Sequence, residues 1–311
     1  MAVTLAEAAV LSQNDLQRGV LETFVQASPV LDRLPLMNIE GNAYAYNKEA
    51  TLPGVAFRSV NEAYTESTGT VNQATESLVI LGGDADVDKF IVQTRGNLND
   101  QRAVQTAMKV KAASYKFQDS FINGDVAVDP KGFDGLKKRL TGSQVLDAAT
   151  NGIGPVAGGH DFFDALDALV AQVAGGADAL YANSAVIAKI MSSARRLGGA
   201  DMITEALTGK RVATYNGIPL LDIGKTAAGA DIITRTETQG TAAGTSSSIY
   251  AVKFGQDEGD QAVTGLTNGG VQVYDLGELD SKPAYRTRLE FYCGLAVFGN
   301  GAARLRGVLT A

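Results

Sequence analysis

The sequence predicts an α+β protein with four parts: an N-terminal arm, a projecting β-hairpin, one long helix and a separate α/β lobe. Residues 100–122 have the apolar periodicity of a single long helix. Helix and strand patterns then alternate between residues 160 and 254, which indicates a compact α/β unit. The 311 residues include 35 glycines but only 7 prolines, a composition typical of a chain with many tight turns.

Composition argues against several classes of protein. Hydrophobic residues make up 45% of the chain and charged residues 20%, which is the composition of a globular protein. The net charge of -7 argues against a protein whose whole surface binds nucleic acid. One Cys and one His cannot form a disulfide within the chain or a zinc site that needs several such ligands. The start of the chain lacks a signal-peptide pattern and no stretch is apolar enough to span a membrane, so we expect folding in a reducing cytoplasm.

The first 38 residues have the pattern of an arm rather than of a domain. Asn14 can cap a short helix that continues to about Gln26, and Ser28-Pro29 ends it because the residue before proline avoids the helical conformation. The apolar stripe of this helix consists of Leu16, Val20, Leu21 and Phe24. An extended apolar segment follows. We therefore expect the arm to lie on another surface.

Residues 41–80 have a β pattern but few residues that could form a core. Tyr44 and Tyr46 alternate with small or polar neighbours, Pro53-Gly54 predicts a turn, and residues 55–60 have a strand pattern. Residues 61–77 are nearly all polar. Two such strands would not be stable alone in water. The segment is therefore either a flexible surface loop or a projecting hairpin that contacts another subunit.

Two further strands are predicted, at residues 78–81 and 87–94. Three carboxylates in this region, Asp84, Asp86 and Asp88, are spaced so that they share one face of a strand. They resemble the start of a calcium loop, but Lys89 stands where that loop needs glycine and Arg95 where it needs glutamate. A strand that faces solvent or another subunit is the better interpretation.

The long helix begins after Asn99, a capping candidate, and ends at Asn123-Gly124. At 1.5 Å per residue, a helix over residues 100–122 is roughly 35 Å long. The predicted buried stripe consists of Val104, Met108, Tyr115 and Ile122, with Ala107 beside it. The predicted opposite side carries Arg102, Lys109, Lys116 and Asp119.

A glycine-rich linker over residues 141–160 precedes the α/β lobe, and its glycines do not have the G-x-G-x-x-G spacing of a dinucleotide site. The lobe is predicted to contain helices from residue 160 and over 184–197, strands at 179–182, 232–236 and 249–254, and a hairpin around Asn216-Gly217. The C-terminal segment returns to strand. Its predicted apolar face consists of Thr287, Leu289, Phe291, Cys293, Leu295 and Val297, and its other face of Arg286, Arg288, Glu290 and Tyr292. Asn300-Gly301 then predicts a further hairpin with a bulge or a longer loop.

No catalytic, cofactor or metal site is predicted. His160 stands beside Asp161 at a helix start, where it is a neighbour of the cap rather than a catalytic base. Cys293 lies mid-strand on the apolar face, where it acts as a small buried hydrophobe. Carboxylates are plentiful, but no motif singles out a pair of them. We therefore expect no enzymatic activity.

The order of these parts resembles the major capsid protein of tailed bacteriophages. The local strings that carry the resemblance are SPVLDRLPL, GNAYAYNKEATLPGVAFRSVNE, LGGDADVDKFIV, DPKGFDGL, YNGIPLL and GLAVFGNGAARL. The resemblance covers nearly the whole chain and implies the phage major-capsid fold, which encapsulin shells share. It divides the chain into an N-arm (1–38), an extended loop (39–81), a peripheral domain with the spine helix (82–142), an axial domain (143–270) and returning peripheral strands (271–311).

The resemblance also implies a shell-forming subunit that assembles as hexamers and pentamers into an icosahedral capsid around double-stranded DNA. The implied place is the virion, with assembly in the host bacterial cytoplasm. The expected partners are other copies of the chain, the packaged DNA, a separate scaffolding protein and a portal, with no membrane. Candidates for contacts between subunits are Phe24, Tyr44, Tyr46, Lys48, Phe57, Arg58, Asp86 and Asp88.

Three other interpretations stay open at this point. An encapsulin-like shell has the same fold but houses protein cargo. Another phage structural protein, such as a tail-tube or decoration subunit, is the second, and the long helix argues against it. A hydrolase that uses unmarked carboxylates is the third, and the missing motifs argue against it.

Overall fold

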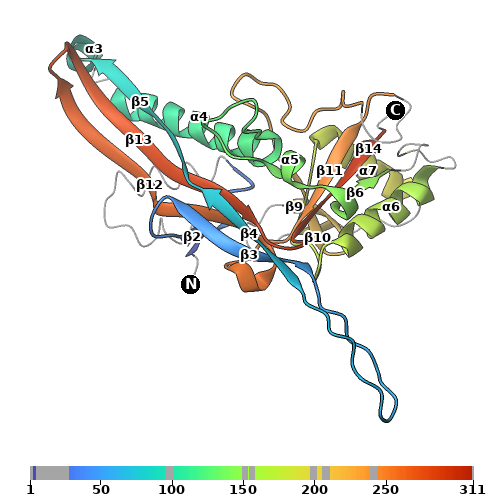
Figure 1. Ribbon diagram of the computed structural model, residues 1–311. Coiled ribbons are helices and arrows are strands. Elements are labelled where there is room, and N and C mark those ends of the chain that lie inside the picture. The colour runs from blue at the N-terminus through green and yellow to red at the C-terminus, as the bar shows by residue number, and fades with distance from the viewer. Residues whose placement is uncertain are drawn as a thin grey trace.

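The computed structural model describes residues 3–4, 28–95, 101–148, 153, 158–196, 202–204, 211–238 and 244–309. Two lobes lie side by side, and a thin hairpin projects away from both near their junction (Figure 1). The predicted helix over residues 14–26 lies outside the described residues. None of the helices in the described part of the chain has the length and hydropathy of a membrane-spanning segment.

The first lobe is built on a five-stranded sheet with the strand order β1-β2-β12-β13-β5. Its strands are β1 (Val3–Thr4), β2 (Pro35–Asn38), β5 (Val79–Asp88), β12 (Val263–Leu279) and β13 (Lys282–Val297). All neighbours are antiparallel except β2 and β12. The predicted apolar face of β13 is confirmed, since Leu289, Phe291, Cys293 and Leu295 are buried.

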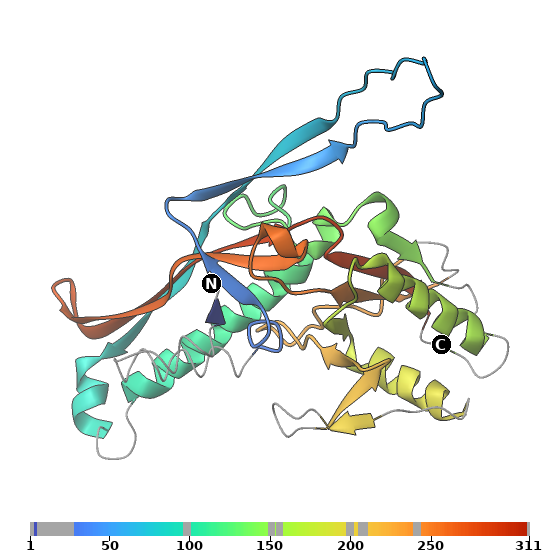
Figure 2. The same cartoon turned by 90° about the horizontal axis from the view of Figure 1, so that it is seen from below.

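Helix α4 (Gln101–Asn123) covers one face of this sheet and confirms the predicted long helix (Figures 1 and 2). Ile122 is buried as predicted, but the rest of the predicted buried stripe is wrong. Met108 is 61% exposed and Val104 42%, whereas the buried side consists of Thr106, Val110, Ala113, Ser114, Phe117, Gln118, Phe121 and Ile122. Alanine, valine and methionine occur on several sides of this helix, so the apolar spacing is compatible with more than one buried stripe. The rings of Phe117 and Phe121 decide between them because they pack against Phe133, Phe291 and Tyr181.

Helix α3 (Lys89–Arg95) replaces most of the strand predicted over residues 87–94. The side chain of Asp88 ends β5, because its Oδ1 accepts a hydrogen bond of 2.8 Å from the backbone N–H of Phe90. An aspartate that satisfies a free N–H at this position favours a helix start over strand continuation. After α4 come the short helix α5 (Leu136–Arg139) and the 3-10 turn η1 (Gly142–Gln144).

The second lobe is built on a seven-stranded mixed sheet with the order β6-β14-β11-β7-β10-β9-β8. Its strands are β6 (Val145–Asp147), β7 (Ala179–Ala182), β8 (Met202–Thr204), β9 (Arg211–Tyr215), β10 (Ile218–Asp222), β11 (Ser247–Val252) and β14 (Ala302–Val308). Helices α6 (Gly158–Gln172) and α7 (Ser184–Arg196) pack on one face. The predicted strand at 179–182, helix at 184–197 and hairpin at Asn216-Gly217 are confirmed. Residues 232–236 form no strand.

The hairpin predicted at Asn300-Gly301 is wrong, because β13 and β14 belong to different sheets. Residues 298–301 carry the chain from one sheet to the other. Gly301 permits this crossing, since a Cβ atom there would lie 2.4 Å from Ala262 Cα. Residues 302–308, which the sequence groups with the peripheral strands, therefore pair with β11 and β6 of the second lobe.

One core joins the two lobes. Val110, Phe117 and Phe121 of α4 pack in the same cluster as Phe291 of the first sheet and Tyr181 of the second. A second cluster lies between the seven-stranded sheet and helices α6 and α7. Because the first cluster contains residues from both sheets, the two lobes share one hydrophobic core and are not independent domains joined by a linker.

Candidate assembly surfaces

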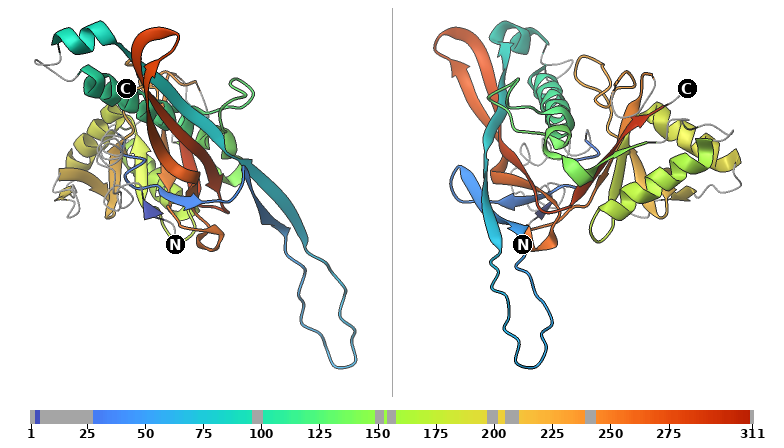
Figure 3. Two further views of the ribbon diagram at one scale, coloured as in Figure 1. Left: turned by 90° about the vertical axis from the view of Figure 1, so that its left-hand side faces the viewer. Right: turned by 45° about the vertical axis from the view of Figure 1, so that its right-hand side comes forward.

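The projecting hairpin consists of β3 (Ala43–Thr51) and β4 (Thr70–Ser77), joined by residues 52–69 (Figure 3). The joining residues form the hairpin tip, which is exposed throughout and contains no strand, so the strand predicted over 55–60 is absent. A strand needs a partner for its backbone groups, and no described strand pairs with these residues. The tip exposes five large apolar side chains: Leu52, Val55, Phe57, Val60 and Tyr64. Phe57 is fully exposed.

Internal contacts give the tip a defined shape. The guanidinium of Arg58 lies 5.2 Å from the centre of the Tyr64 ring and donates hydrogen bonds to the carbonyl oxygens of Ser59 and Glu62. The Ser59 N–H donates to Glu62 Oε2 at 2.9 Å. Arg58 therefore folds back on the tip, whereas no residue of the described chain covers the Phe57 side chain beside it.

The root of the hairpin is fixed to the body. Tyr46 is only 8% exposed, and its ring centre lies 4.8 Å from that of Phe298 in an edge-to-face pair. Tyr44 stacks on Tyr46 at 6.2 Å. Arg139 of α5 binds Glu76 of β4 through two nitrogens, with Nη2 2.6 Å from Oε2. Burial raises the pKa of Tyr46, with the Glu76 carboxylate as the next cause.

The two tyrosines therefore anchor the hairpin on its own subunit. Tyr46 has little surface left for a neighbour, whereas Tyr44 is half-buried. Sequence reasoning missed Phe298 and the Arg139–Glu76 pair. Their partners lie far away in the chain, and no local pattern connects such positions.

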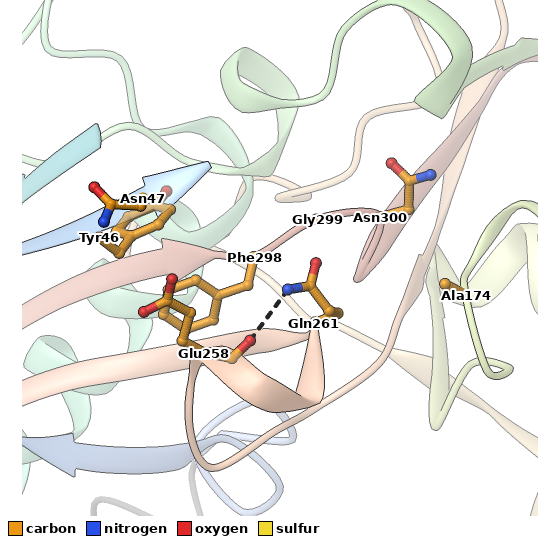
Figure 4. A pocket seen from close by; sticks show the side chains of 8 residues that line it. All are labelled: Tyr46, Asn47, Ala174, Glu258, Gln261, Phe298, Gly299 and Asn300. Carbon is orange, nitrogen blue, oxygen red and sulfur yellow. Dashed lines mark hydrogen bonds between the residues drawn. The ribbon is translucent and has the colours of Figure 1, made fainter. Parts of the chain in front are cut away.

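A cavity of about 480 Å³ lies between this root and the crossing at residues 298–301 (Figure 4). Its lining comes from four separate segments and consists of Tyr46, Asn47, Ala174, Glu258, Gln261, Phe298, Gly299 and Asn300. Gln261 Nε2 donates to the carbonyl oxygen of Glu258 at 3.3 Å. The amide groups and the carboxylate of this lining can form hydrogen bonds with a peptide, and the two rings add apolar surface. The lining residues do not include a nucleophile with an adjacent base.

The outer face of the five-stranded sheet carries a ladder of ion pairs. Arg288 Nε lies 2.8 Å from Asp84 Oδ1, and Arg286 Nε lies 2.7 Å from Asp86 Oδ1. Lys282 reaches Asp86 as well, at 2.6 Å. The hydrogen bond from Arg288 lowers the pKa of Asp84, and that from Arg286 lowers the pKa of Asp86. These carboxylates hold β5 to β13, and no described group of three His, Cys, Asp or Glu residues could bind a metal.

The remaining contact candidates have mixed positions. Phe24 lies outside the described residues, and of Lys48 only the backbone is described, paired with Asn72 in the hairpin. Asp88 caps α3. The structure thus brings Tyr44 and Tyr46 together at the hairpin root, leaves Phe57 and Arg58 at its tip, and gives Asp86 and Asp88 partners within the chain.

A buried ionic cluster joins the two lobes. Glu237 Oε2 lies 3.1 Å from Arg304 Nη2 and accepts a 2.6 Å hydrogen bond from Ser248 Oγ, while Lys137 Nζ lies 3.2 Å from Oε1. The side chains of Glu237 and Arg304 are 7% and 6% exposed. All these groups are paired, so the cluster holds the chain together rather than awaiting a ligand.

Residues 12–161 match the model of a family described as major capsid protein GP7. This part of the chain is therefore similar to a major capsid protein. The fold of the whole chain is similar to that of the SrpI encapsulin of Synechococcus elongatus PCC 7942, with 20% identity, a TM-score of 0.67 and coverage of 92% of this chain and 89% of that one. No curated protein matches this sequence.

Two further solved structures share the fold. The capsid of a native GTA particle matches with 15% identity and a TM-score of 0.65, over 90% of this chain and 89% of that chain. A structure from Mycobacterium phage Bobi matches with 16% identity and a TM-score of 0.56, over 98% of both chains. The phage major-capsid fold expected from the sequence is therefore confirmed for this chain.

Proposed function

We propose that this chain is a phage major capsid protein that builds an icosahedral shell of hexamers and pentamers around double-stranded DNA, and that its hairpin joins neighbouring subunits. The observation that carries the proposal is the hairpin itself. Its root is fixed by Tyr46, Phe298 and the Arg139–Glu76 pair, while its tip exposes apolar side chains with nothing to cover them.

Apolar side chains on a projecting ribbon favour a partner. Leu52, Val55 and Val60 are 77%, 95% and 91% exposed, and a two-stranded ribbon is marginal in water. Contact with a second copy would bury these side chains at roughly 25 cal/mol for each Å² of apolar surface removed from water. A shell supplies such a contact to every subunit, so the hairpin gains its stability on assembly.

The charge of the chain fits a container for DNA. A net charge of -7 prevents tight binding of the contents over the whole shell, so the packaged DNA contacts only the inner surface. A separate scaffolding protein and a portal are the expected assembly partners. The virion is the proposed location of the finished shell, and the host cytoplasm is the proposed place of assembly.

Removal of the tip tests this function. Thr51 Oγ1 and Thr70 Oγ1 lie 2.6 Å apart, so an Asn-Gly turn can replace residues 52–69 and close the ribbon without loss of the root contacts. We expect this variant to fold and to remain unassembled, while the full chain forms closed shells in negative-stain micrographs. Closed shells from the shortened chain would show that the hairpin is not the joint.

An encapsulin-like compartment is the second candidate, because the TM-score of 0.67 to the SrpI encapsulin is above that to the GTA capsid. Both candidates predict closed shells, so particle shape does not separate them. The neighbouring genes distinguish the two candidates. Portal and terminase genes would support the phage capsid, and a gene for a cargo enzyme would support the compartment. Rings or tubes instead of shells would support a tail-tube subunit.

A further inference from the structure

The two helices of the second lobe lie at opposite ends of the same sheet face. Helix α6 packs over β14 and β6, and α7 packs over β10, so the central strands separate them. Figure 2 shows α6 and α7 on separate flanks of the lobe. Each helix therefore has an outer side that nothing in the described chain covers.

These outer sides carry opposite charges. Helix α6 contains Asp161, Asp164 and Asp167 and no Lys or Arg, whereas α7 contains Lys189, Arg195 and Arg196 and no Asp or Glu. The three aspartates and both arginines are exposed. Small exposed side chains, Ala168 on α6 and Ala188 on α7, lie among the charges and leave room for another helix to approach.

Most of these charges have no opposite charge beside them. Asp167 accepts hydrogen bonds from Tyr215 and Asn216 and so anchors the β9–β10 turn. Arg195 donates to the carbonyl oxygen of Met191 within its own helix. Within the part of the chain that the structure describes, Asp161, Asp164, Lys189, Arg195 and Arg196 form no ion pair.

We propose that α6 of one copy docks against α7 of a second copy, and that repetition of this contact closes a ring. The contact joins two different surfaces, so it is head-to-tail, and head-to-tail contacts generate rings when the rotation closes. Complementary charges select this pairing and counter the mutual repulsion of chains that each carry a net charge of -7. The inference rests on the proposed function and names the contact within one ring of the shell.

Charge reversal on each helix tests the contact. The first variant combines Asp161→Lys with Asp164→Lys, so both helices are basic apart from Asp167. The second combines Arg195→Glu with Arg196→Glu, so both are acidic apart from Lys189. Each variant alone faces like charges at every contact, and we expect about a tenfold or greater loss of ring and shell yield by native mass spectrometry and electron microscopy. The chain with all four changes restores opposite charges, and we expect it to recover assembly.

A mixture of the two variants gives the sharpest result. Every contact is complementary only when the variants alternate, which is possible around a six-membered ring but not around a five-membered one. We therefore expect the mixture to form hexamers and to lack pentamers, while the wild-type chain forms both. Circular dichroism of each variant confirms that the subunits are folded, and rescue in the mixture confirms it independently.

The outcomes separate this contact from the proposed function. Wild-type shells together with unimpaired shells from both single-helix variants would overturn the ring contact and leave the shell function standing. Loss in the single-helix variants without rescue by the four-change chain or by the mixture would overturn it as well. If the wild-type chain forms no shells, the shell function fails, and charge-dependent rings in native mass spectra still decide the contact.

Discussion

Replacement of Phe117 by alanine should destabilise the whole subunit, because this side chain occupies the core shared by both lobes. Phe117 is 1% exposed, and its ring centre lies 5.8 Å from those of Phe133 and Phe291. Deletion of a buried phenyl ring costs about 3–5 kcal/mol through lost burial and the cavity left behind. Alanine is the better helix former, so the expected loss comes from packing and not from the backbone.

Met108→Ala on the same helix is the matched control. Met108 is 61% exposed, so we expect its replacement to change the free energy of unfolding by no more than about 0.5 kcal/mol. Urea unfolding followed by circular dichroism measures both variants, with the tip-shortened subunit as background to keep assembly out of the measurement. Equal destabilisation by the two substitutions would refute the assignment of the buried face of α4.

Three further perturbations probe other parts of the chain. Glu237→Gln removes the buried carboxylate that Lys137 and Arg304 share, so we expect the free energy of unfolding to fall by about 3–5 kcal/mol. A loss below about 1 kcal/mol by urea titration would contradict the role of this cluster. Asp84→Asn should destabilise the subunit at pH 7. The hydrogen bond from Arg288 lowers the pKa of Asp84 in the folded chain. The stabilisation by this ion pair is therefore complete above the unfolded pKa of about 3.9, and it disappears as the pH falls through the folded pKa. A constant difference between this variant and wild type from pH 7 down to pH 2 would show that the ion pair is not the cause. Cys293 is fully buried and burial raises the pKa of its thiol to about 12, so a thiol reagent should label it only on unfolding, and rapid labelling of the folded chain would place it at the surface.

Local patterns predicted the elements whose signals lie within a few residues. The strand at 179–182 and the helix that begins at Ser184 follow from short apolar periods, and the hairpin at Asn216-Gly217 follows from its turn residues. The two faces of β13 follow from alternation alone, because one side packs on α4 and the other faces solvent.

The errors arose where distant residues decide the structure. The buried side of α4 is chosen by Tyr181 and Phe291, which come from two different sheets, and helix periodicity contains no information about either. The turn at Asn300-Gly301 has hairpin residues, but the strand after it pairs with β11 instead of returning to β13. Tyr46 lies in a segment whose alternating pattern predicts a projecting ribbon, yet its ring packs against Phe298 and is buried in the body of the subunit.

The hairpin fixed at its root acts as a lever. From Ala43 to Val60 the chain runs outward over 18 residues, which at about 3.3 Å per residue is an arm of roughly 60 Å at most. A rotation of only about 5° at the root would move the tip by roughly 5 Å at that length. In the proposed shell, small adjustments around Tyr46 and Phe298 would be amplified at the far end of the hairpin. The tip would then reach neighbours set at different angles, as on the flat and the curved parts of a closed surface.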